Sequence, residues 1–137
     1  GTLHTNYEGK AKAAVDVLLK EGYDFVYVHV EAPDEMGHQG SIDRKVKAIE
    51  YLDEKVIRPV KKAMDTSGED YRMLILPDHP TPIACRTHTS DPIPYLLYDS
   101  TDTGIKTETA QYNEKQAAAG GILVSEGYRL IEKLLEE

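Results

Sequence analysis

The stretch from residue 24 to residue 38, DFVYVHVEAPDEMGH, changes character in its middle. Its first part, Asp24–Val30, is rich in β-branched and aromatic residues and almost continuously apolar, which is typical of a strand buried on both faces of a sheet. Its second part, Glu31–His38, is polar and carries Pro33 close to its start. The change predicts a central parallel strand that ends in a cluster of polar side chains.

Helical patterns flank this strand on both sides. Before it, apolar residues recur at three- and four-residue spacing over Tyr7–Lys20, with Thr5 or Asn6 as the N-cap. After it, Ser41–Ala63 has a second helical pattern, which Pro59 is expected to bend or shorten. The apolar residues in register in this second helix are Ile42, Val46, Ile49, Leu52, Val56 and Val60.

The remainder of the chain continues the alternation of strands and helices. Met73–Leu76 reads as a second buried strand and Pro94–Tyr98 as a shorter third one, and helices are expected over Asn113–Ala119 and Ser125–Leu135. This order of elements is typical of an α/β sheet covered by helices. We therefore predict a single α/β domain with a mostly parallel sheet and helices on both faces.

The composition disfavours several classes of protein. The 137 residues are 40% hydrophobic and 29% charged, as in folded globular domains, and the net charge of −8 opposes binding to nucleic acid or anionic membranes. No apolar run approaches the roughly 20 residues that span a bilayer, and Gly1 opens no signal segment, so we expect a cytoplasmic protein. Cys85 is the only cysteine, so a metal site has to use histidine and carboxylate ligands.

The polar cluster after the first strand contains a possible ligand pair. If the residues after Pro33 take a helical turn, Asp34 and His38 lie at i and i+4 on one face, close enough to hold one cation. A carboxylate with an imidazole suits Zn²⁺ or Mn²⁺ better than Ca²⁺. The alternative is a helix start capped by Asp34, with His38 in solvent.

A second polar cluster follows the second strand. Asp78 and His79 are adjacent, so on an extended chain they would point to opposite sides and serve two neighbouring cations, or serve one cation from a sharply turned loop. The alternative is a β-turn with Asp78 at its first position. His88 adds a third imidazole to the same loop, and the combination favours a metal centre over five unrelated surface residues.

Three other residues have less specific readings. His29 lies within the predicted buried strand and is interpreted as a hydrogen-bonded core or supporting histidine. Arg86 is either an exposed loop residue or a guanidinium that binds a phosphate or carboxylate. Cys85 has no partner cysteine and reads as an inert thiol.

Three segments carry a family resemblance: residues 29–38 (HVEAPDEMGH), 76–82 (LPDHPTP) and 86–94 (RTHTSDPIP). Together they resemble the signature segments of the archaeal-type, cofactor-independent phosphoglycerate mutases of the alkaline phosphatase superfamily. The resemblance runs from Thr5 through the last helix. It implies an alkaline phosphatase-like fold and a glycolytic isomerase that interconverts 3-phosphoglycerate and 2-phosphoglycerate through a phosphoserine, without 2,3-bisphosphoglycerate.

The resemblance also implies a bimetallic centre of Mn²⁺ or Zn²⁺. Carried over by position, Asp34, His38 and His88 would hold one ion, and Asp78 and His79 the second. With a phosphorylated three-carbon acid as substrate, Arg86 is the candidate for a contact to its phosphate or carboxylate. The family's nucleophilic serine, a further metal-binding aspartate and the inserted substrate domain have no counterpart here. We therefore expect a partial metalloenzyme domain with no catalytic nucleophile of its own, inactive as a mutase by itself.

Other functions remain open from the sequence. The metal ligands alone would also suit another alkaline phosphatase superfamily phosphotransferase or hydrolase, or a non-catalytic metal-binding module. A zinc peptidase is disfavoured because the helix carries Asp-x-x-x-His and not two histidines flanking a glutamate. Unpaired sheet edges or apolar patches are expected to drive assembly into a homo-oligomer.

Overall fold

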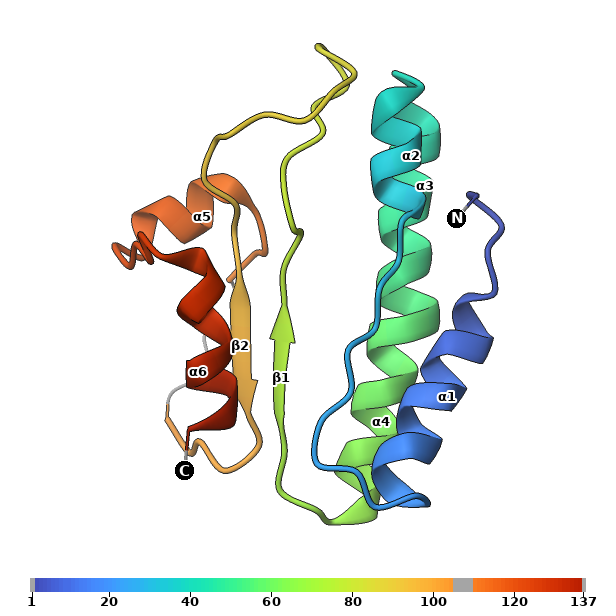
Figure 1. The fold of residues 1–137 in the computed structure, drawn as a ribbon, viewed down its shortest axis with the longest axis vertical. Helices are drawn as coiled ribbons and strands as arrows, with labels where there is room; N and C mark the ends of the chain where they lie inside the picture. The colour runs from blue at the N-terminus through green and yellow to red at the C-terminus, as the bar shows by residue number, and fades with distance from the viewer. Residues whose placement is uncertain (1, 105–109, 137) are drawn as a thin grey trace. The chain divides into compact units, whose positions relative to one another are not determined.

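The computed structural model describes residues 2–104 and 110–136. These residues form two compact units. The first consists of the chain up to Glu69 together with Thr81–Thr89, and the second consists of Asp70–Pro80 together with the chain from Ser90 onward (Figure 1). The chain therefore leaves the first unit, returns to it for one loop, and then completes the second.

Helix α1 spans Tyr7–Leu19, as the sequence predicts. It begins at Asn6, whose side-chain oxygen accepts a hydrogen bond from the backbone N–H of Gly9 at 3.0 Å and so satisfies a group that has no partner within the helix. Gly9 leaves room for this cap, because a Cβ there would lie 2.2 Å from Asn6 Nδ2. The structure thus selects Asn6 over Thr5 as the N-cap.

Replacing Asn6 by alanine is expected to lower the free energy of unfolding by about 1 kcal/mol, because the Gly9 N–H loses its acceptor. Urea unfolding followed by circular dichroism measures the change. Asn6→Asp keeps an acceptor and should stay within a few tenths of a kcal/mol of the unsubstituted protein. Equal stability of the alanine and aspartate variants would contradict this role for the cap.

Helices α2 and α3 follow one another through a tight turn. Helix α2 spans Ala32–His38 and α3 spans Ile42–Leu52. Gly40 between them has a φ of 67°, a left-handed conformation that suits glycine. Ser41 then caps α3 by accepting a hydrogen bond from the backbone N–H of Arg44 at 3.4 Å. The helical turn expected after Pro33 is therefore present as α2.

Helix α3 continues through a π-helical segment, Asp53–Ile57, into α4, Arg58–Ser67 (Figure 1). The backbone N–H of Arg58 donates to the Asp53 carbonyl, five residues earlier. In an α-helix the ring of Pro59 would clash with the carbonyl four residues before it, and a wider π turn at this point relieves that conflict. Of the two expectations for Pro59, shortening of the helix is wrong, since the helix runs on to Ser67, and a bend stays a prediction.

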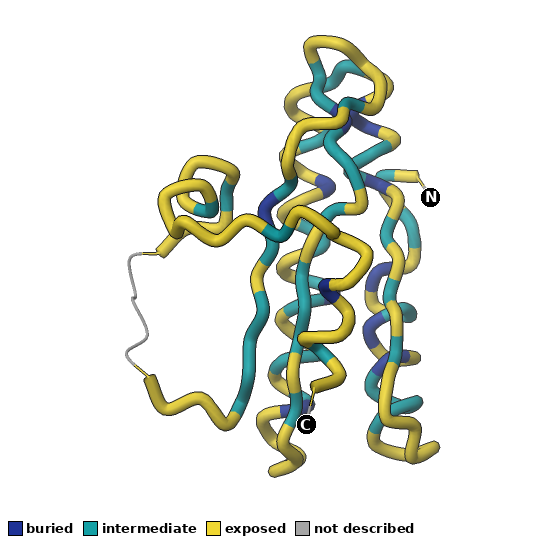
Figure 2. The backbone as a smooth tube through the Cα atoms, turned by 60° about the vertical axis from the view of Figure 1, so that its left-hand side comes forward, coloured by how far each residue is buried: buried dark blue, intermediate teal, exposed yellow. Residues whose placement is uncertain are grey.

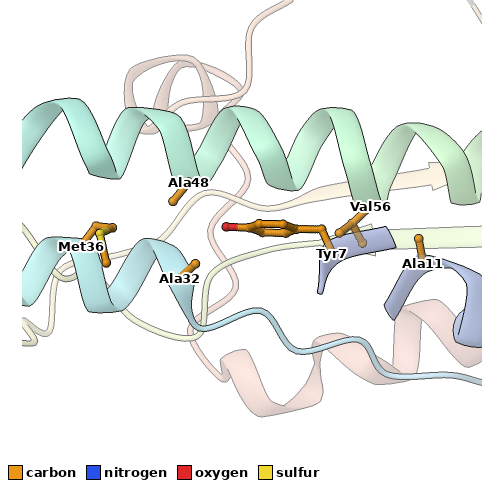
Figure 3. Close-up of a cluster of buried hydrophobic side chains, with 6 residues drawn as sticks. All are labelled: Tyr7, Ala11, Ala32, Met36, Ala48 and Val56. Carbon is orange, nitrogen blue, oxygen red and sulfur yellow. The ribbon is translucent and has the colours of Figure 1, made fainter. Parts of the chain in front are cut away.

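The core of the first unit lies between α1, α2 and the long α3–α4 helix, and Figure 2 maps the burial of each residue on the backbone. Figure 3 shows the ring of Tyr7 at the centre of the cluster, and its hydroxyl donates to the Leu3 carbonyl at 2.7 Å. Tyr7 also packs at a tilt against Tyr51, with ring centroids 5.6 Å apart. The buried cluster consists of Tyr7, Ala11, Ala32, Met36, Ala48 and Val56.

Asp24–Val30 differs from its prediction. Among the described residues it belongs to no hydrogen-bonded ladder, and Figure 1 shows it as a trace without helical turns between α1 and α2. Every second residue from Val26 to Val30 is half-buried, whereas the residues between them are exposed, Tyr27 by 70%. The prediction of burial on both faces is therefore wrong. Aromatic residues occupy the exposed positions, so an alternating pattern reads as a continuous apolar run.

The second unit contains two strands, β1 at Arg72–Ile75 and β2 at Leu96–Asp99, at the positions that the sequence indicates. They pair antiparallel, from Arg72 opposite Asp99 to Ile75 opposite Leu96. The predicted mostly parallel sheet is thus not found in the described part of the chain. Parallel neighbours usually need a crossover helix, and the connection from Leu76 to Tyr95 is a proline-rich loop without one.

The β1–β2 ladder ends in a charged pair. Asp99 accepts a hydrogen bond from the Thr101 hydroxyl at 2.6 Å and one from Arg72 Nε at 2.9 Å. These bonds favour the ionised carboxylate, Thr101 contributing more than Arg72, and lower the pKa of Asp99 to about 2. The carboxylate therefore stays charged at any pH at which the protein would work.

Two short helices complete the second unit. Helix α5 spans Glu114–Ala119, with Asn113 as its N-cap, and α6 spans Leu130–Leu135 after a 3₁₀ turn at Gly127–Arg129. Both lie within the stretches predicted as helices, and α6 packs on β1. In the part of the chain that the structure describes, no helix combines the length and the apolar character that crossing a membrane requires.

Candidate metal centre

Helix α2 presents two different faces. Ala32 and Met36, at i and i+4, are buried in the core of the first unit. Asp34 and His38 are also at i and i+4, and each follows one of the buried residues by two positions. They therefore lie on the opposite side of the helix, where Asp34 Oδ1 is 3.4 Å from His38 Nε2. The core that fixes α2 therefore also fixes the direction of the ligand pair predicted from the sequence.

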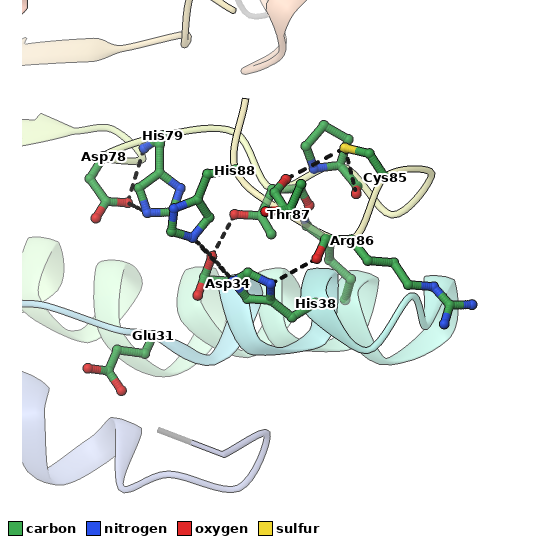
Figure 4. Close-up of polar contacts among 12 residues, drawn as sticks. Glu31, Asp34, His38, Asp78, His79, Cys85, Arg86, Thr87 and His88 are labelled. Atoms are coloured by element: carbon green, nitrogen blue, oxygen red, sulfur yellow. Dashed lines mark hydrogen bonds and ion pairs between the residues drawn. The ribbon is translucent and has the colours of Figure 1, made fainter. Parts of the chain in front are cut away.

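The loop Thr81–Thr89, which belongs to the same unit, brings His88 to this pair (Figure 4). His88 Nε2 lies 3.1 Å from Asp34 Oδ1 and 3.2 Å from His38 Nε2. The three side chains each offer one ligand atom, and these atoms all lie within 4.8 Å of one another. The structure thus gathers three of the five predicted ligands at one point.

The distances suit a small divalent cation. A cation held tetrahedrally by bonds of about 2.0–2.2 Å keeps its ligand atoms roughly 3.3–3.6 Å apart, near the 3.1, 3.2 and 3.4 Å found here. Two imidazole nitrogens and one carboxylate oxygen form a ligand set suited to zinc or manganese. The side chain of Asp34 is 32% exposed and that of His88 51%, so a further coordination position can face solvent or a substrate.

The orientation of His38 is fixed from its other ring nitrogen. His38 Nδ1 lies 2.9 Å from the backbone carbonyl of Arg86, which can only accept, so Nδ1 donates this hydrogen bond and Nε2 is the ring nitrogen that can coordinate a cation. Arg86 makes this carbonyl available through an unusual backbone, since its φ of 53° is the only positive value at a described non-glycine residue. The backbone of Arg86 therefore contributes to the site.

The side chain of Arg86 is exposed and crosses Gly40, where a Cβ would lie 2.4 Å from Arg86 Nε. Cys85 is also exposed, and its thiol donates to the carbonyls of Pro82 and Thr87 at 3.7 and 3.6 Å. Both residues lie on the same loop as His88, Thr81–Thr89. A substrate contact by Arg86 stays a prediction.

Asp78 and His79 lie in the second unit. The backbone N–H of His79 donates to Asp78 Oδ1 at 3.1 Å, and His79 Nε2 lies 3.4 Å from the same oxygen. The two side chains therefore turn toward one another, as in the sharply turned loop considered above, and do not point to opposite sides. Together they offer an imidazole nitrogen and carboxylate oxygens.

Two residues differ from the reading of the sequence. His29 is half exposed, with Nε2 3.8 Å from Glu31 Oε1, so its interpretation as a core histidine is wrong. Thr81 received no role in the sequence analysis, yet it is buried and its hydroxyl donates to Asp34 Oδ1 at 2.6 Å. The only sequence signal for Thr81 is its place between two prolines, immediately after the Asp78-His79 pair.

Comparisons with known proteins agree with a metal site. Residues 2–126 match the metalloenzyme superfamily. The chain is 46% identical over 136 residues to a Geobacter sulfurreducens protein named as a probable 2,3-bisphosphoglycerate-independent phosphoglycerate mutase, covering 99% of this chain and 33% of that protein. It is 49% identical over 125 residues to the Methanosarcina barkeri protein named as such a mutase, covering 90% of this chain and 30% of that one.

A solved structure of a Pyrococcus horikoshii protein is also similar, with a TM-score of 0.80 and 28% identity, covering 98% of this chain and 39% of that one. The chain thus spans about a third of the length of the curated relatives that it matches.

Proposed function

Because the chain belongs to the metalloenzyme superfamily, we propose that Asp34, His38 and His88 hold one divalent cation, as part of a 2,3-bisphosphoglycerate-independent phosphoglycerate mutase. The observation that carries the proposal is the convergence of the three ligand atoms, within 4.8 Å, from segments 50 residues apart in the chain. Relatives named as such mutases are 46% identical over 136 residues and 49% identical over 125 residues.

The chemistry of the ligands supports zinc or manganese as the cation. The proton on His38 Nδ1 leaves Nε2 free to coordinate, and His88 also approaches through Nε2. Asp34 supplies the single negative charge among the three side chains, so a bound divalent cation would keep a net positive charge and attract an anionic substrate. A phosphorylated three-carbon acid is an anion of this kind.

Asp78 and His79 are proposed to hold the second cation of a two-metal centre, and the exposed guanidinium of Arg86 is proposed to contact a phosphate or carboxylate of the substrate. Bound divalent cations would neutralise charge on a transferring phosphoryl group and lower the pKa of an attacking hydroxyl. The nucleophilic serine of the phosphoserine route would lie in the part of the relatives that this chain does not match.

The parent protein would thus be an isomerase of glycolysis that works without 2,3-bisphosphoglycerate, which suits a cytoplasmic location. The net charge of −8 argues against nucleic acid or an anionic membrane as partner. The 137 residues alone are proposed to bind metal without turnover, as a partial domain. Assembly into a homo-oligomer stays a prediction.

Calorimetric titration of Mn²⁺ and Zn²⁺ into this chain tests the first part of the proposal. We expect one tight site per chain, from the three gathered ligands, and weaker binding by Asp78 and His79. Absence of a tight site for either ion would contradict the metal centre.

The activity is tested in a protein of the relatives' length that contains this chain. That protein is expected to convert 3-phosphoglycerate to 2-phosphoglycerate without added 2,3-bisphosphoglycerate, to lose this activity in chelator, and to regain it with Mn²⁺ or Zn²⁺. Metal binding without any mutase activity would instead favour another phosphotransferase or a non-catalytic module.

A further inference from the structure

Thr81 is the one buried polar residue among those that the structure describes, with 4% of its surface exposed. A buried hydroxyl is costly unless it is hydrogen-bonded, and the Thr81 hydroxyl donates to Asp34 Oδ1 at 2.6 Å, a short bond to a charged acceptor. The acceptor is the same oxygen that lies 3.1 Å from His88 Nε2. Thr81 thus touches the centre of the ligand cluster from its buried side.

The backbone of Thr81 is itself held by two helices. From α3, Lys45 Nζ donates to the Thr81 carbonyl at 2.5 Å. From α2, Gly37 allows a close approach, because a Cβ at this position would lie 2.5 Å from the Thr81 carbonyl oxygen and 3.0 Å from its Cγ2. The hydroxyl therefore reaches Asp34 from an anchored backbone and not from a mobile loop.

This arrangement restricts the carboxylate of Asp34. The terminal torsion of an aspartate is broad, so an isolated carboxylate can turn freely between two equivalent orientations. A hydroxyl fixed at one oxygen removes that freedom, and hydrogen bonds of this kind to metal-binding carboxylates typically change metal affinity by about 10–100-fold.

We infer that Thr81 is a positioning residue, which holds the Asp34 carboxylate in the orientation that binds the cation, while Lys45 and Gly37 hold Thr81. The inference rests on the proposed function, since it concerns the same metal centre. Thr81 would act through Asp34 and not as a ligand of the cation.

The test compares three single variants by calorimetric titration with Mn²⁺ and Zn²⁺. Thr81→Val keeps the shape of the side chain and removes the hydroxyl, so its affinity should fall by about 10-fold or more. Thr81→Ser keeps the hydroxyl and should stay within about 3-fold of the unsubstituted chain. Thr87→Val makes the same chemical change at an exposed position of the same loop and should bind normally.

A fourth variant weakens the anchoring of Thr81 without changing Thr81 itself. Lys45→Met removes the ammonium that holds the Thr81 carbonyl but leaves the hydroxyl in place, and should weaken metal binding several-fold. Circular dichroism of each metal-free variant shows whether the fold is kept.

The outcomes separate the inference from the proposed function. Tight binding by the unsubstituted chain and by Thr81→Val alike overturns the role of Thr81 and leaves the metal centre standing. Equal losses in Thr81→Val and Thr81→Ser also overturn it, because a merely structural role would not depend on the hydroxyl. Absence of binding by the unsubstituted chain overturns both.

Discussion

Replacing Asp34 by asparagine is expected to reduce the affinity for Mn²⁺ and Zn²⁺ by at least about 100-fold, with the fold retained. The substitution preserves the size of the side chain and removes its negative charge. Asp34 Oδ1 is the atom shared by the cluster, at 3.1 Å from His88 Nε2 and 3.4 Å from His38 Nε2. Without the carboxylate only two imidazoles remain at this point, and calorimetric titration reports the loss.

Glu35→Gln is the matched control. Glu35 is the next residue of α2, is exposed, and loses the same charge in this substitution, so it separates coordination from general attraction of a cation to an acidic surface. It should change the affinity by less than about 3-fold, because screened surface charges act weakly. The double variant His38→Ala, His88→Ala should bind no more tightly than Asp34→Asn. If Glu35→Gln and Asp34→Asn lost equal affinity, the three-ligand site would be wrong.

Replacing Tyr7 by alanine is expected to lower the free energy of unfolding of the first unit by about 3–5 kcal/mol. Tyr7 is the largest fully buried side chain among the described residues, with 2% exposed, and it fills the space between α1, α2 and the α3–α4 helix. The surrounding cluster contains alanines at positions 11, 32 and 48, which cannot expand into the cavity. Urea unfolding measures the loss.

Tyr7→Phe separates packing from hydrogen bonding. It removes only the hydroxyl that donates to Leu3, so it should cost about 1 kcal/mol. Tyr23→Ala makes the larger substitution at a tyrosine that is 63% exposed and should change stability by no more than about 0.5 kcal/mol. Comparable losses at Tyr7 and Tyr23 would contradict the assignment of the core.

The buried Tyr7 is also expected to make the stability of the fold depend on pH. Burial, and then the nearby Tyr51, raise the pKa of Tyr7 above its ordinary value of 10.0, because both disfavour the phenolate. The unfolded chain therefore releases this proton first, so the stability due to Tyr7 is complete below pH 10 and declines as the pH rises through the raised pKa. The decline should be smaller in Tyr7→Phe.

Local rules were enough to find the helices and the positions of the strands in the second unit. The spacing of apolar residues and the cap at Asn6 define α1, and β1 and β2 fall in short apolar stretches bounded by Pro77 and Pro94. Whether two strands pair parallel or antiparallel is harder to predict, because it depends on which strand lies next to which in the fold. The order of elements suggested parallel neighbours, but the loop from Leu76 to Tyr95 carries no crossover helix.

The face of a helix that the core uses is equally hard to read from the sequence. Ile42, Val46 and Ile49 have the spacing of a buried stripe, yet they are 65%, 50% and 51% exposed, whereas Ala48 of the same helix is fully buried. Apolar periodicity shows that a helix has a face, and only the packing shows which face the core of this unit uses. The sequence alone does not show that Ala48 is buried in the same cluster as the ring of Tyr7.

The candidate ligands were predictable because their side chains have few other uses in such spacing. Asp34 and His38 follow from the helical repeat, and His88 from its place in the same loop as another histidine. Thr81 and the backbone of Arg86 were not predictable. One acts through a single hydroxyl and the other through a carbonyl, and neither group is distinctive until the fold places it 2.6 Å from Asp34 or 2.9 Å from His38.

The separation of the ligands along the chain has a consequence for stability. His38 and His88 are 50 positions apart, so a cation bound to both would act as a reversible cross-link within these 137 residues, whose single cysteine allows no disulfide among them. If such a cation binds the folded chain and not the unfolded one, it would add about 2.7 kcal/mol when its free concentration is 100 times its dissociation constant. The lifetime of this protein in a cell would then rise and fall with the supply of the metal.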